Sequence, residues 1–216
     1  MKRRHALISL VLFPVLTFCK PVKEAEKPAP APAAATAKAS KVRLKTNKGE
    51  ILIELNAEKA PITVANFLSY VVNKHYDGTV FHRVIDGFMI QGGGFALEGK
   101  EIVEKETGKG ITNEGKNGLK NERGSIAMAR TNDPNSATSQ FFINVADNEM
   151  LNYPNNGGYA VFGKVVEGMN VVDQIKSTAT GTTTLTMRNP MTGQKIPAPS
   201  TDVPTENIVI QSATAE

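Results

Sequence analysis

The stretch TVFHRVIDGFMIQGGG, residues 79–94, is the clearest indication of the fold in this chain of 216 residues. Its two halves, TVFHRVI and FMIQG, read as β-strands, and the dipeptide Asp86-Gly87 between them is typical of a hairpin turn. Arg83 and Gln91 interrupt these otherwise apolar strands. Because an unpaired buried charge is strongly destabilising, Arg83 must reach solvent or find acceptors. It is therefore either an edge residue that extends into water or a functional cation held on a rigid sheet.

Short strands with similar patterns lie on both sides of this hairpin. Further strands are predicted over residues 41–46, 50–55, 124–130, 139–145, 159–166 and 207–213, and the spacing of apolar residues predicts helices over 60–74 and 169–177. Several short strands, one long helix and no alternation of strands with helices favour a mainly β fold, a closed antiparallel barrel plugged by helices. The polar, proline-containing segment 180–206 is expected to be a long surface loop.

Residues 1–19 have the composition of an export signal. Three cationic residues precede an apolar run over 6–18, which is too short to span a bilayer as a helix, since about 20 residues are needed. This pattern predicts a secretory signal and a periplasmic or cell-envelope location. Cys19 directly follows the run, at the place of the lipid-modified cysteine in the bacterial lipoprotein signals that this segment resembles. The alternative is an unmodified cysteine that is removed with the signal.

Residues 20–40 form a Pro/Ala/Lys/Glu segment with almost no aliphatic bulk. Such a segment cannot bury enough apolar surface to fold, so it is predicted to be a disordered tether between a membrane and a folded domain, residues 41–216. The formal net charge of +4 does not indicate a nucleic-acid-binding face, because three of these charges belong to the signal and +1 remains without them. With Cys19 as the only cysteine, an intramolecular disulfide is impossible.

Motifs for familiar catalytic chemistry are missing from the sequence. Beyond the signal there are two histidines, His75 and His82, and no cysteine cluster, which is too few ligands for a zinc site. The segment QGGGF lacks the Gly-Lys-Ser/Thr ending of a phosphate loop, and no serine lies in a Gly-x-Ser-x-Gly motif. These patterns predict no metal, no cofactor and no covalent nucleophile. A binding module, or a reaction that needs none of these groups, remains.

Four motifs, FHRVIDGFMIQGGGF, GSIAMAR, SQFFINVADNEML and YAVFGKVVEGM, occur in the order and approximate spacing of cyclophilins, the peptidyl-prolyl cis/trans isomerases. The chain most resembles the bacterial periplasmic branch, over Lys41 to Ala213. The resemblance implies an eight-stranded barrel capped by two helices, a proline-binding groove on its outer face, a monomer, and proline-containing polypeptides as clients. By matching motif positions, Arg83 is implied as the catalytic residue. The residues implied in substrate binding are Phe88, Met89, Gln91, Ala129, Gln140, Phe142, Met150, Leu151 and Tyr159.

The chemistry of such an isomerase suits these residue types. An X-Pro bond resists rotation because the nitrogen lone pair delocalises into the carbonyl, with a barrier of about 18–20 kcal/mol. Arg83 would donate to the prolyl nitrogen as it becomes pyramidal and so weaken the delocalisation, while apolar side chains bury the ring. With an export signal, the expected role is to assist the folding of exported proteins. The alternatives are a peptide-binding module without turnover and a carbohydrate-binding β-domain, which the lack of tryptophan disfavours.

A shared groove places a condition on the hairpin. With a two-residue turn, Arg83 and Gln91 would lie on opposite faces of the sheet, whereas a turn one residue longer sets them opposite one another. We therefore expect a bulge or a widened turn near residues 86–88. By the same alternation, Phe141 and Phe142 must point to opposite faces, and one of them must belong to the core.

Two groove positions differ from other members of the family. Met150 stands where cyclosporin-sensitive cyclophilins carry a tryptophan whose indole N–H contacts the drug, and Tyr159 stands where many eukaryotic members have histidine. Methionine offers apolar contact but no hydrogen-bond donor. The substitution at Met150 therefore predicts weak inhibition by cyclosporin, with substrate turnover affected much less.

Overall fold

The computed structural model describes residues 40–189 and 192–216. The predicted signal at 1–19, with Cys19, and the predicted tether up to its last residue lie outside these ranges and stay predictions. Within the described ranges, no helix is long and apolar enough to cross a membrane. The first strand begins at Lys41, directly after the first described residue.

The strands of the described chain form one sheet of thirteen members. The strands are β1 (Lys41–Thr46), β2 (Gly49–Leu55), β3 (Thr79–Val80), β4 (Arg83–Ile85), β5 (Met89–Gly92), β6 (Phe95–Glu98), β7 (Glu101–Glu104), β8 (Ser125–Met128), β9 (Phe141–Asn144), β10 (Val161–Glu167), β11 (Thr180–Arg188), β12 (Lys195–Pro204) and β13 (Val209–Ala215). The helices are α2 (Pro61–Val72), α3 (Met169–Lys176) and the short 3-10 helices η1 (Glu149–Leu151) and η2 (Asn155–Gly157). The mainly β class is confirmed.

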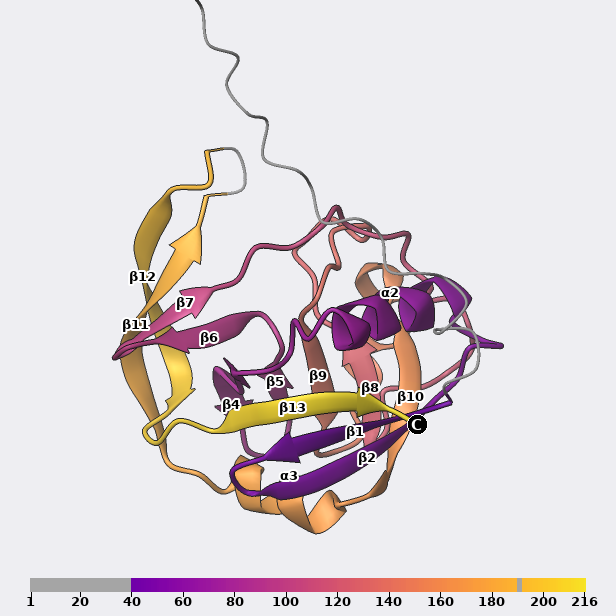
Figure 1. Ribbon diagram of the computed structural model, residues 1–216. Helices are drawn as coiled ribbons and strands as arrows, with labels where there is room; N and C mark the ends of the chain where they lie inside the picture. Colours follow the sequence, from indigo (N-terminus) through magenta and orange to yellow (C-terminus); the bar gives the residue numbers. More distant parts are fainter. Residues whose placement is uncertain (1–39, 190–191) are drawn as a thin grey trace, which may run out of the picture.

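The sheet closes on itself into a barrel (Figure 1). Its strand order is β12-β11-β7-β6-β3-β13-β1-β2-β10-β8-β9-β5-β4. Strands β3 and β4 are two halves of one segment, residues 79–85, of which the first half pairs with β13 and the second with β5. Counted as one strand, this segment completes a ring with β13, β1, β2, β10, β8, β9 and β5. The expected eight strands therefore describe the ring alone, whereas the whole sheet has thirteen.

Strands β6, β7, β11 and β12 extend from β3 outside the ring and are called the side ribbon (Figure 1). The expectation of a long surface loop over 180–206 is wrong, because β11 and β12 form a hairpin there. Most side chains of this hairpin are exposed on both faces, so no apolar alternation marks it in the sequence. Its prolines lie on an edge strand, where a missing N–H donor is tolerated. Leu185 and Val203 pack with Val80 and Phe95 in a small core of their own.

The two α-helices close the ends of the barrel (Figure 1). Val64, Phe67, Leu68 and Val71 of α2 recur at helical spacing and are buried in the barrel core. Pro61 stands at the start of α2, where its missing N–H removes no helical hydrogen bond. The buried side of α3 likewise joins the barrel core. Both helices are therefore confirmed, with ends within two residues of those expected.

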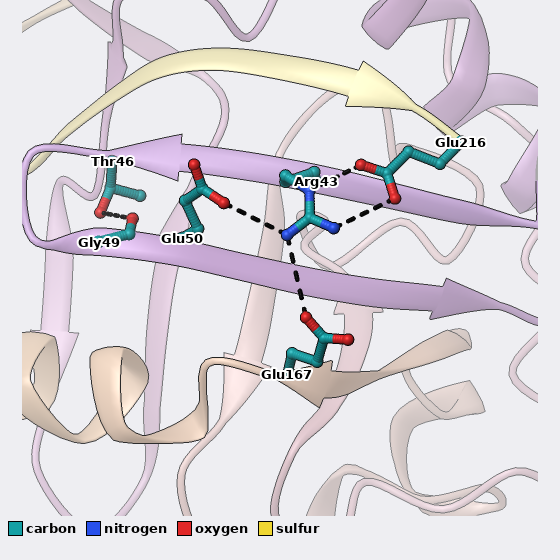
Figure 2. A network of polar contacts seen from close by, with 6 residues as sticks. All are labelled: Arg43, Thr46, Gly49, Glu50, Glu167 and Glu216. Carbon is teal, nitrogen blue, oxygen red and sulfur yellow. Dashed lines mark hydrogen bonds and ion pairs between the residues drawn. The ribbon is translucent and has the colours of Figure 1, made fainter.

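An exposed ion network on β1 is centred on Arg43 (Figure 2). Nε of Arg43 donates to Glu216 at 2.6 Å, and a terminal nitrogen donates to Glu50 at 3.3 Å. Glu167 of β10 lies 3.9 Å from the same guanidinium. The hydrogen bond from Arg43 holds the pKa of Glu216 below its usual value. The network joins β1, β2, β10 and the residue after β13, although each exposed pair is worth little by itself.

The hairpin of β4 and β5 has the longer turn that a shared groove requires. Arg83 pairs with Gln91, so residues 86–88 form a three-residue turn. Gly87 has a φ of +73°, a conformation that glycine adopts without strain. The expectation of a widened turn is confirmed, and it brings the arginine and the glutamine to the same face.

Candidate active site

A row of side chains crosses the outer face of the barrel from β4 to β10. Arg83 lies opposite Gln91, and Gln91 lies opposite Phe142. Phe142 in turn lies opposite Ala127, and Ala127 lies opposite Val161. Directly opposed residues on antiparallel strands point to the same face. The register of β4, β5, β9, β8 and β10 therefore sets five side chains from distant parts of the sequence beside one another.

Three members of this row, Arg83, Gln91 and Phe142, line a groove with a cavity volume of about 280 Å³, and Ala127 and Val161 pack with Phe142 in a buried cluster. The lining residues are Arg83, Phe88, Met89, Gln91, Ala129, Arg130, Phe142, Leu151 and Tyr159. Two larger hollows, of about 550 and 420 Å³, lie elsewhere and have walls rich in charged and amide side chains. Binding sites for small groups are mostly apolar with a few convergent polar groups. The smaller groove fits this description, so we take it as the candidate active site.

The floor of the groove is an apolar cluster distinct from the barrel core. Met89, Ala127, Phe142 and Val161 are at most 4% exposed within it. The partly exposed apolar residues packed against them are Ile85, Phe88, Leu119, Ala129, Leu151 and Tyr159. The rings of Phe142 and Tyr159 meet edge to face, with centroids 5.8 Å apart. The floor is therefore packed and shaped before any ligand arrives.

Neighbouring residues of β9 serve the two sides of the sheet. Phe141 is fully buried in the barrel core, where it meets Phe67 and Tyr76 edge to face, whereas Phe142 belongs to the groove floor. The expected division between the two phenylalanines is confirmed. It follows from the two-residue period of a β-strand.

Arg83 stands at the rim of the groove with 44% of its side chain exposed. Its nearest charged partner is Asp202 of β12, whose Oδ2 lies 3.9 Å from Nε of Arg83. This distance is longer than a hydrogen bond, so within the described part of the chain the N–H donors of the guanidinium stay available. Such a cation on a rigid strand can stabilise charge that develops on a bound ligand.

Gln91 and Gln140 form an amide pair beside Arg83. Nε2 of Gln91 donates to Oε1 of Gln140 at 2.9 Å. The backbone oxygen of Gln140 accepts from the N–H of Ala129, also at 2.9 Å. Gln140 is not itself in the lining, but it fixes two residues that are. Of the residues expected in the groove, it is therefore a supporting one.

Three buried asparagines beneath the groove connect the loops that form its walls. Asn148 donates to the backbone oxygen of Phe88 at 2.8 Å and to Oδ1 of Asn144 at 2.7 Å. Asn144 donates to Oδ1 of Asn121 at 3.2 Å, and Asn121 donates to the backbone oxygen of Leu151 at 3.2 Å. All three amides are at most 5% exposed. Because buried amides that satisfy one another are rigid, this chain fixes two walls of the groove.

Arg130 is a wall residue that the sequence analysis missed. Its guanidinium lies over the ring of Tyr159, with Cζ 4.3 Å from the ring centroid, and it donates to the backbone oxygens of Asn156 and Gly158. It thereby holds Tyr159 in place through a cation–π contact. The available signal was its place directly after Ala129, at the end of the motif GSIAMAR.

Met150 is the one other expected groove residue outside the lining. Its side chain is 70% exposed, whereas the next residue, Leu151, is partly buried in the wall. Both belong to the short helix η1, whose tight turn directs neighbouring side chains to different sides. A role for Met150 in contact with larger ligands stays a prediction.

The two histidines of the folded part are absent from the groove lining. Burial lowers the pKa of His75 to about 4, and the charge of Lys105 acts in the same direction. Burial likewise lowers the pKa of His82 to about 4, with a smaller contribution from Arg83. Among the described residues, no three His, Cys, Asp or Glu side chains are grouped so as to hold a metal ion. Both histidines are therefore neutral near pH 7, with His82 buried in the packed interior and His75 partly buried.

Comparison with known proteins relates this geometry to one family. Residues 41–215 match the family described as "Cyclophilin type peptidyl-prolyl cis-trans isomerase/CLD". The match covers every strand of the ring and the whole groove.

Individual relatives point to the same family. The chain is 52% identical over 178 residues to "Peptidyl-prolyl cis-trans isomerase cyp18" of Streptomyces antibioticus, and the aligned region covers 81% of this chain and 97% of that protein. It is 49% identical over 177 residues to "Peptidyl-prolyl cis-trans isomerase B" of Escherichia coli, and the aligned region covers 80% of this chain and 98% of that protein. A crystal structure of a Cryptosporidium parvum cyclophilin in the presence of the dipeptide Ala-Pro superposes with a TM-score of 0.61 at 28% identity, covering 82% of this chain and 98% of the other.

Proposed function

Since this chain belongs to the cyclophilin family of peptidyl-prolyl cis-trans isomerases, we propose that it catalyses X-Pro rotation in exported polypeptides at the groove beside Arg83. The observation that carries this proposal is the row of side chains across five strands, which sets a cation at one end of a preformed apolar floor. The apolar floor can bury the ring of a bound proline, and the cation can donate a hydrogen bond to the prolyl nitrogen.

The reaction requires no covalent step. Rotation about an X-Pro bond is opposed by amide resonance, with a barrier of about 18–20 kcal/mol. Without a catalyst, isomerisation takes tens to hundreds of seconds. A turnover of about 10³ per second therefore requires about 7 kcal/mol of preferential stabilisation of the twisted transition state. Electrostatics and shape complementarity are sufficient for a stabilisation of this size.

Arg83 is the group that stabilises the twisted amide in this mechanism. As the bond rotates, the prolyl nitrogen becomes pyramidal and gains a lone pair that accepts a hydrogen bond. The guanidinium, whose donors are not engaged by Asp202, donates to this nitrogen or to the substrate carbonyl. This bond is stronger in the transition state than in the ground state, so it accelerates rotation rather than binding alone.

The other groove residues hold the substrate on both sides of the rotating bond. Phe142, Met89 and Leu151 bury the pyrrolidine ring, which fixes the prolyl side. Gln91, itself held by Gln140, presents its amide to the neighbouring peptide group. With the ring held and the adjoining peptide oriented, thermal rotation is confined to the X-Pro bond.

The proposed site of action is the cell envelope. A signal over 1–19 that ends in a lipid-modified Cys19 would anchor the protein, and the tether 20–40 would allow it to reach about 65 Å from the membrane when extended. The clients would then be exported chains whose proline bonds isomerise outside the cytoplasm. Fractionation and labelling with a fatty acid test this part: Cys19→Ser should abolish label and membrane partitioning, and equal labelling of the two proteins would refute it.

The activity itself is tested with a proline-containing peptide and an Arg83→Ala variant. Loss of one well-placed donor to developing charge lowers kcat/KM by about 10² to 10³. Arg43→Ala is the matched control, because Arg43 is also part exposed and paired with carboxylates but lies on β1 outside the groove lining. A folded Arg83→Ala protein with undiminished turnover would contradict the assigned role. Peptide binding without turnover by the native protein would instead support the binding module.

A further inference from the structure

The side ribbon contains a local irregularity close to Arg83. In the hairpin of β11 and β12, Thr183 pairs with Ser200 and Gly181 pairs with Val203. Two residues of β12, 201 and 202, therefore stand opposite a single residue of β11. This two-against-one arrangement is a β-bulge, which bends a strand and changes the direction of its side chains.

Asp202 has an unusual backbone conformation within this bulge. Its φ is +59°, in the left-handed region that only asparagine, aspartate and glycine visit readily. Such a conformation inside a strand persists when the surrounding structure enforces it, and it is found preferentially at functional sites. The bulge thus places the Asp202 side chain where regular strand geometry would not.

The carboxylate of Asp202 meets two neighbours. Oδ2 lies 3.9 Å from Nε of Arg83, and the same oxygen accepts a hydrogen bond from the hydroxyl of Thr201 at 3.1 Å. Strands β4 and β12, the two edges of the thirteen-stranded sheet, also lie against each other here without pairing. The side ribbon therefore brings a fixed negative charge to the side of the guanidinium that bears Nε.

From this geometry we infer that Asp202 is a positioning residue for Arg83, an inference that rests on the proposed function of the groove. Asp202 is absent from the groove lining, so it acts through Arg83 and not on the substrate. Its charge restricts the rotamers of the long arginine side chain by attracting Nε toward the ribbon, while Arg83 remains part of the groove lining. A donor oriented before the substrate arrives loses less entropy in the transition state.

The separation of 3.9 Å distinguishes this role from autoinhibition. A carboxylate that blocked Arg83 would occupy its donors through paired hydrogen bonds of about 2.7–2.9 Å. At the observed distance the two charges attract, yet each N–H remains free to donate to a substrate. Asp202 therefore orients the guanidinium without competing for it.

The test is a steady-state comparison of the full-length native protein with Asp202→Asn on a proline peptide without charged residues. Asparagine keeps the shape and tolerates the positive φ, so the fold should be retained. We expect kcat to fall about three- to tenfold with KM within about twofold, because the affected bond forms only in the transition state. Thr201→Val, which loosens the carboxylate, should give a smaller decrease of about twofold.

Ionic strength provides a readout that a structural role would not affect. In about 0.5 M salt the exposed ion pair is screened, so the native kcat should approach that of Asp202→Asn, while the variant should hardly respond. Glu98→Gln is the matched control, because it removes the exposed 2.6 Å ion pair with Lys195 in the same ribbon and touches neither Arg83 nor the groove. If Glu98→Gln lowers kcat as much as Asp202→Asn, loss of ribbon stability is responsible and the inference is overturned.

The variants Arg83→Ala and Arg83→Ala/Asp202→Asn separate this inference from the proposed function. If Asp202 acts through Arg83, its replacement has no further effect once Arg83 is absent. An unchanged or higher kcat/KM for Asp202→Asn, with Arg83→Ala inactive, overturns the positioning role and leaves the proposed function in place. Full activity of Arg83→Ala overturns the role assigned to Arg83, and absence of turnover by the native protein overturns the proposed function itself.

Discussion

The amide of Gln91 donates to Oε1 of Gln140 at 2.9 Å, and the space that Gln140 occupies exists because residue 94 is glycine. A Cβ atom on Gly94 would lie 2.6 Å from Cδ and 2.7 Å from Nε2 of Gln140. Both are closer than any real contact of this kind. Gly94 is therefore required because a larger residue at this position would collide with Gln140, the side chain that orients Gln91.

We accordingly expect Gly94→Ala to displace the Gln140 side chain and release Gln91. Because the displaced atoms, Cγ, Cδ and Nε2, all belong to the Gln140 side chain and none to the backbone, the fold should survive, whereas kcat/KM should fall about three- to tenfold through loss of substrate orientation. Peptide isomerisation and thermal unfolding measure the two effects. Gly108→Ala, whose added Cβ would meet only the Tyr70 hydroxyl at 3.6 Å, is the control. Equal activity of the two variants would show that the glutamine pair does not orient substrate.

Asn148→Ala should weaken both the fold and the groove. The change leaves the buried Oδ1 of Asn144 without its donor and removes one of the two hydrogen bonds that the backbone oxygen of Phe88 accepts. One unsatisfied buried group costs about 1–3 kcal/mol of unfolding free energy. Urea unfolding should show a loss in this range, with a lower kcat/KM. Asn170→Ala, on the exposed side of α3, should change the unfolding free energy by less than about 0.5 kcal/mol. A similarly small change for Asn148→Ala would contradict the network.

The stability of the fold should decrease in mild acid because of His75 and His82. Their pKa values are lowered to about 4 in the folded state, so the fold favours the neutral rings. A histidine in the unfolded chain binds a proton below about pH 6.5. The contribution of the two histidines to the free energy of unfolding is therefore complete above this pH and decreases as pH falls toward 4. Each histidine contributes up to about 1.4 kcal/mol per pH unit in this interval.

Urea unfolding between pH 7.5 and 4.5 measures this slope. Carboxylates with lowered pKa values, including Glu98, Asp173 and Glu216, begin to lose their contribution to stability only as pH approaches the ordinary carboxyl pKa of about 4. The part of the interval above about pH 5.5 therefore reports the histidines. His75→Gln and His82→Gln should each reduce the slope, whatever their effect on stability at pH 7.5. An unaltered slope in both variants would assign the acid sensitivity to other groups.

Met150→Trp should strengthen inhibition by cyclosporin. In the native protein Met150 is 70% exposed and offers a large ligand no hydrogen-bond donor. An indole at this position would add a donor and aromatic contact, which together should tighten inhibition about tenfold or more. Substrate turnover should change little, because Met150 lies outside the groove lining. Cyclosporin inhibition curves of the native and Met150→Trp proteins measure this effect. Tight inhibition of the native protein would refute the expectation.

Much of the ring could be predicted from local patterns. The hairpins over 41–55 and 79–92 were readable because alternate side chains face the core, and each one-residue shift would expose that set. Arg83 was conspicuous for the same reason, as a charge where the pattern requires an apolar residue. Phe141 and Phe142 could be assigned to opposite faces from the period of the strand, but not to a particular face.

The side ribbon and the asparagine network could not be predicted in the same way. Strands β11 and β12 are exposed on both faces, so burial imposes no alternation on their sequence. Asn121 and Asn148 lie in loops and Asn144 ends a strand, and no sequence pattern marks the three as a group, because they meet only in the folded chain.

The sequence by itself determined the class of fold and, through its motifs, the family of peptidyl-prolyl isomerases, and it singled out Arg83 as the cation proposed for catalysis. Only the tertiary structure decided that Arg83, Gln91 and Phe142 lie in one row, that Arg130 holds Tyr159, and that a bulge brings Asp202 to Arg83. The physical reason is the range of the forces involved. Strand and helix patterns record burial within a few neighbouring residues, whereas register across five strands and contact between two sheet edges depend on closure of the whole barrel.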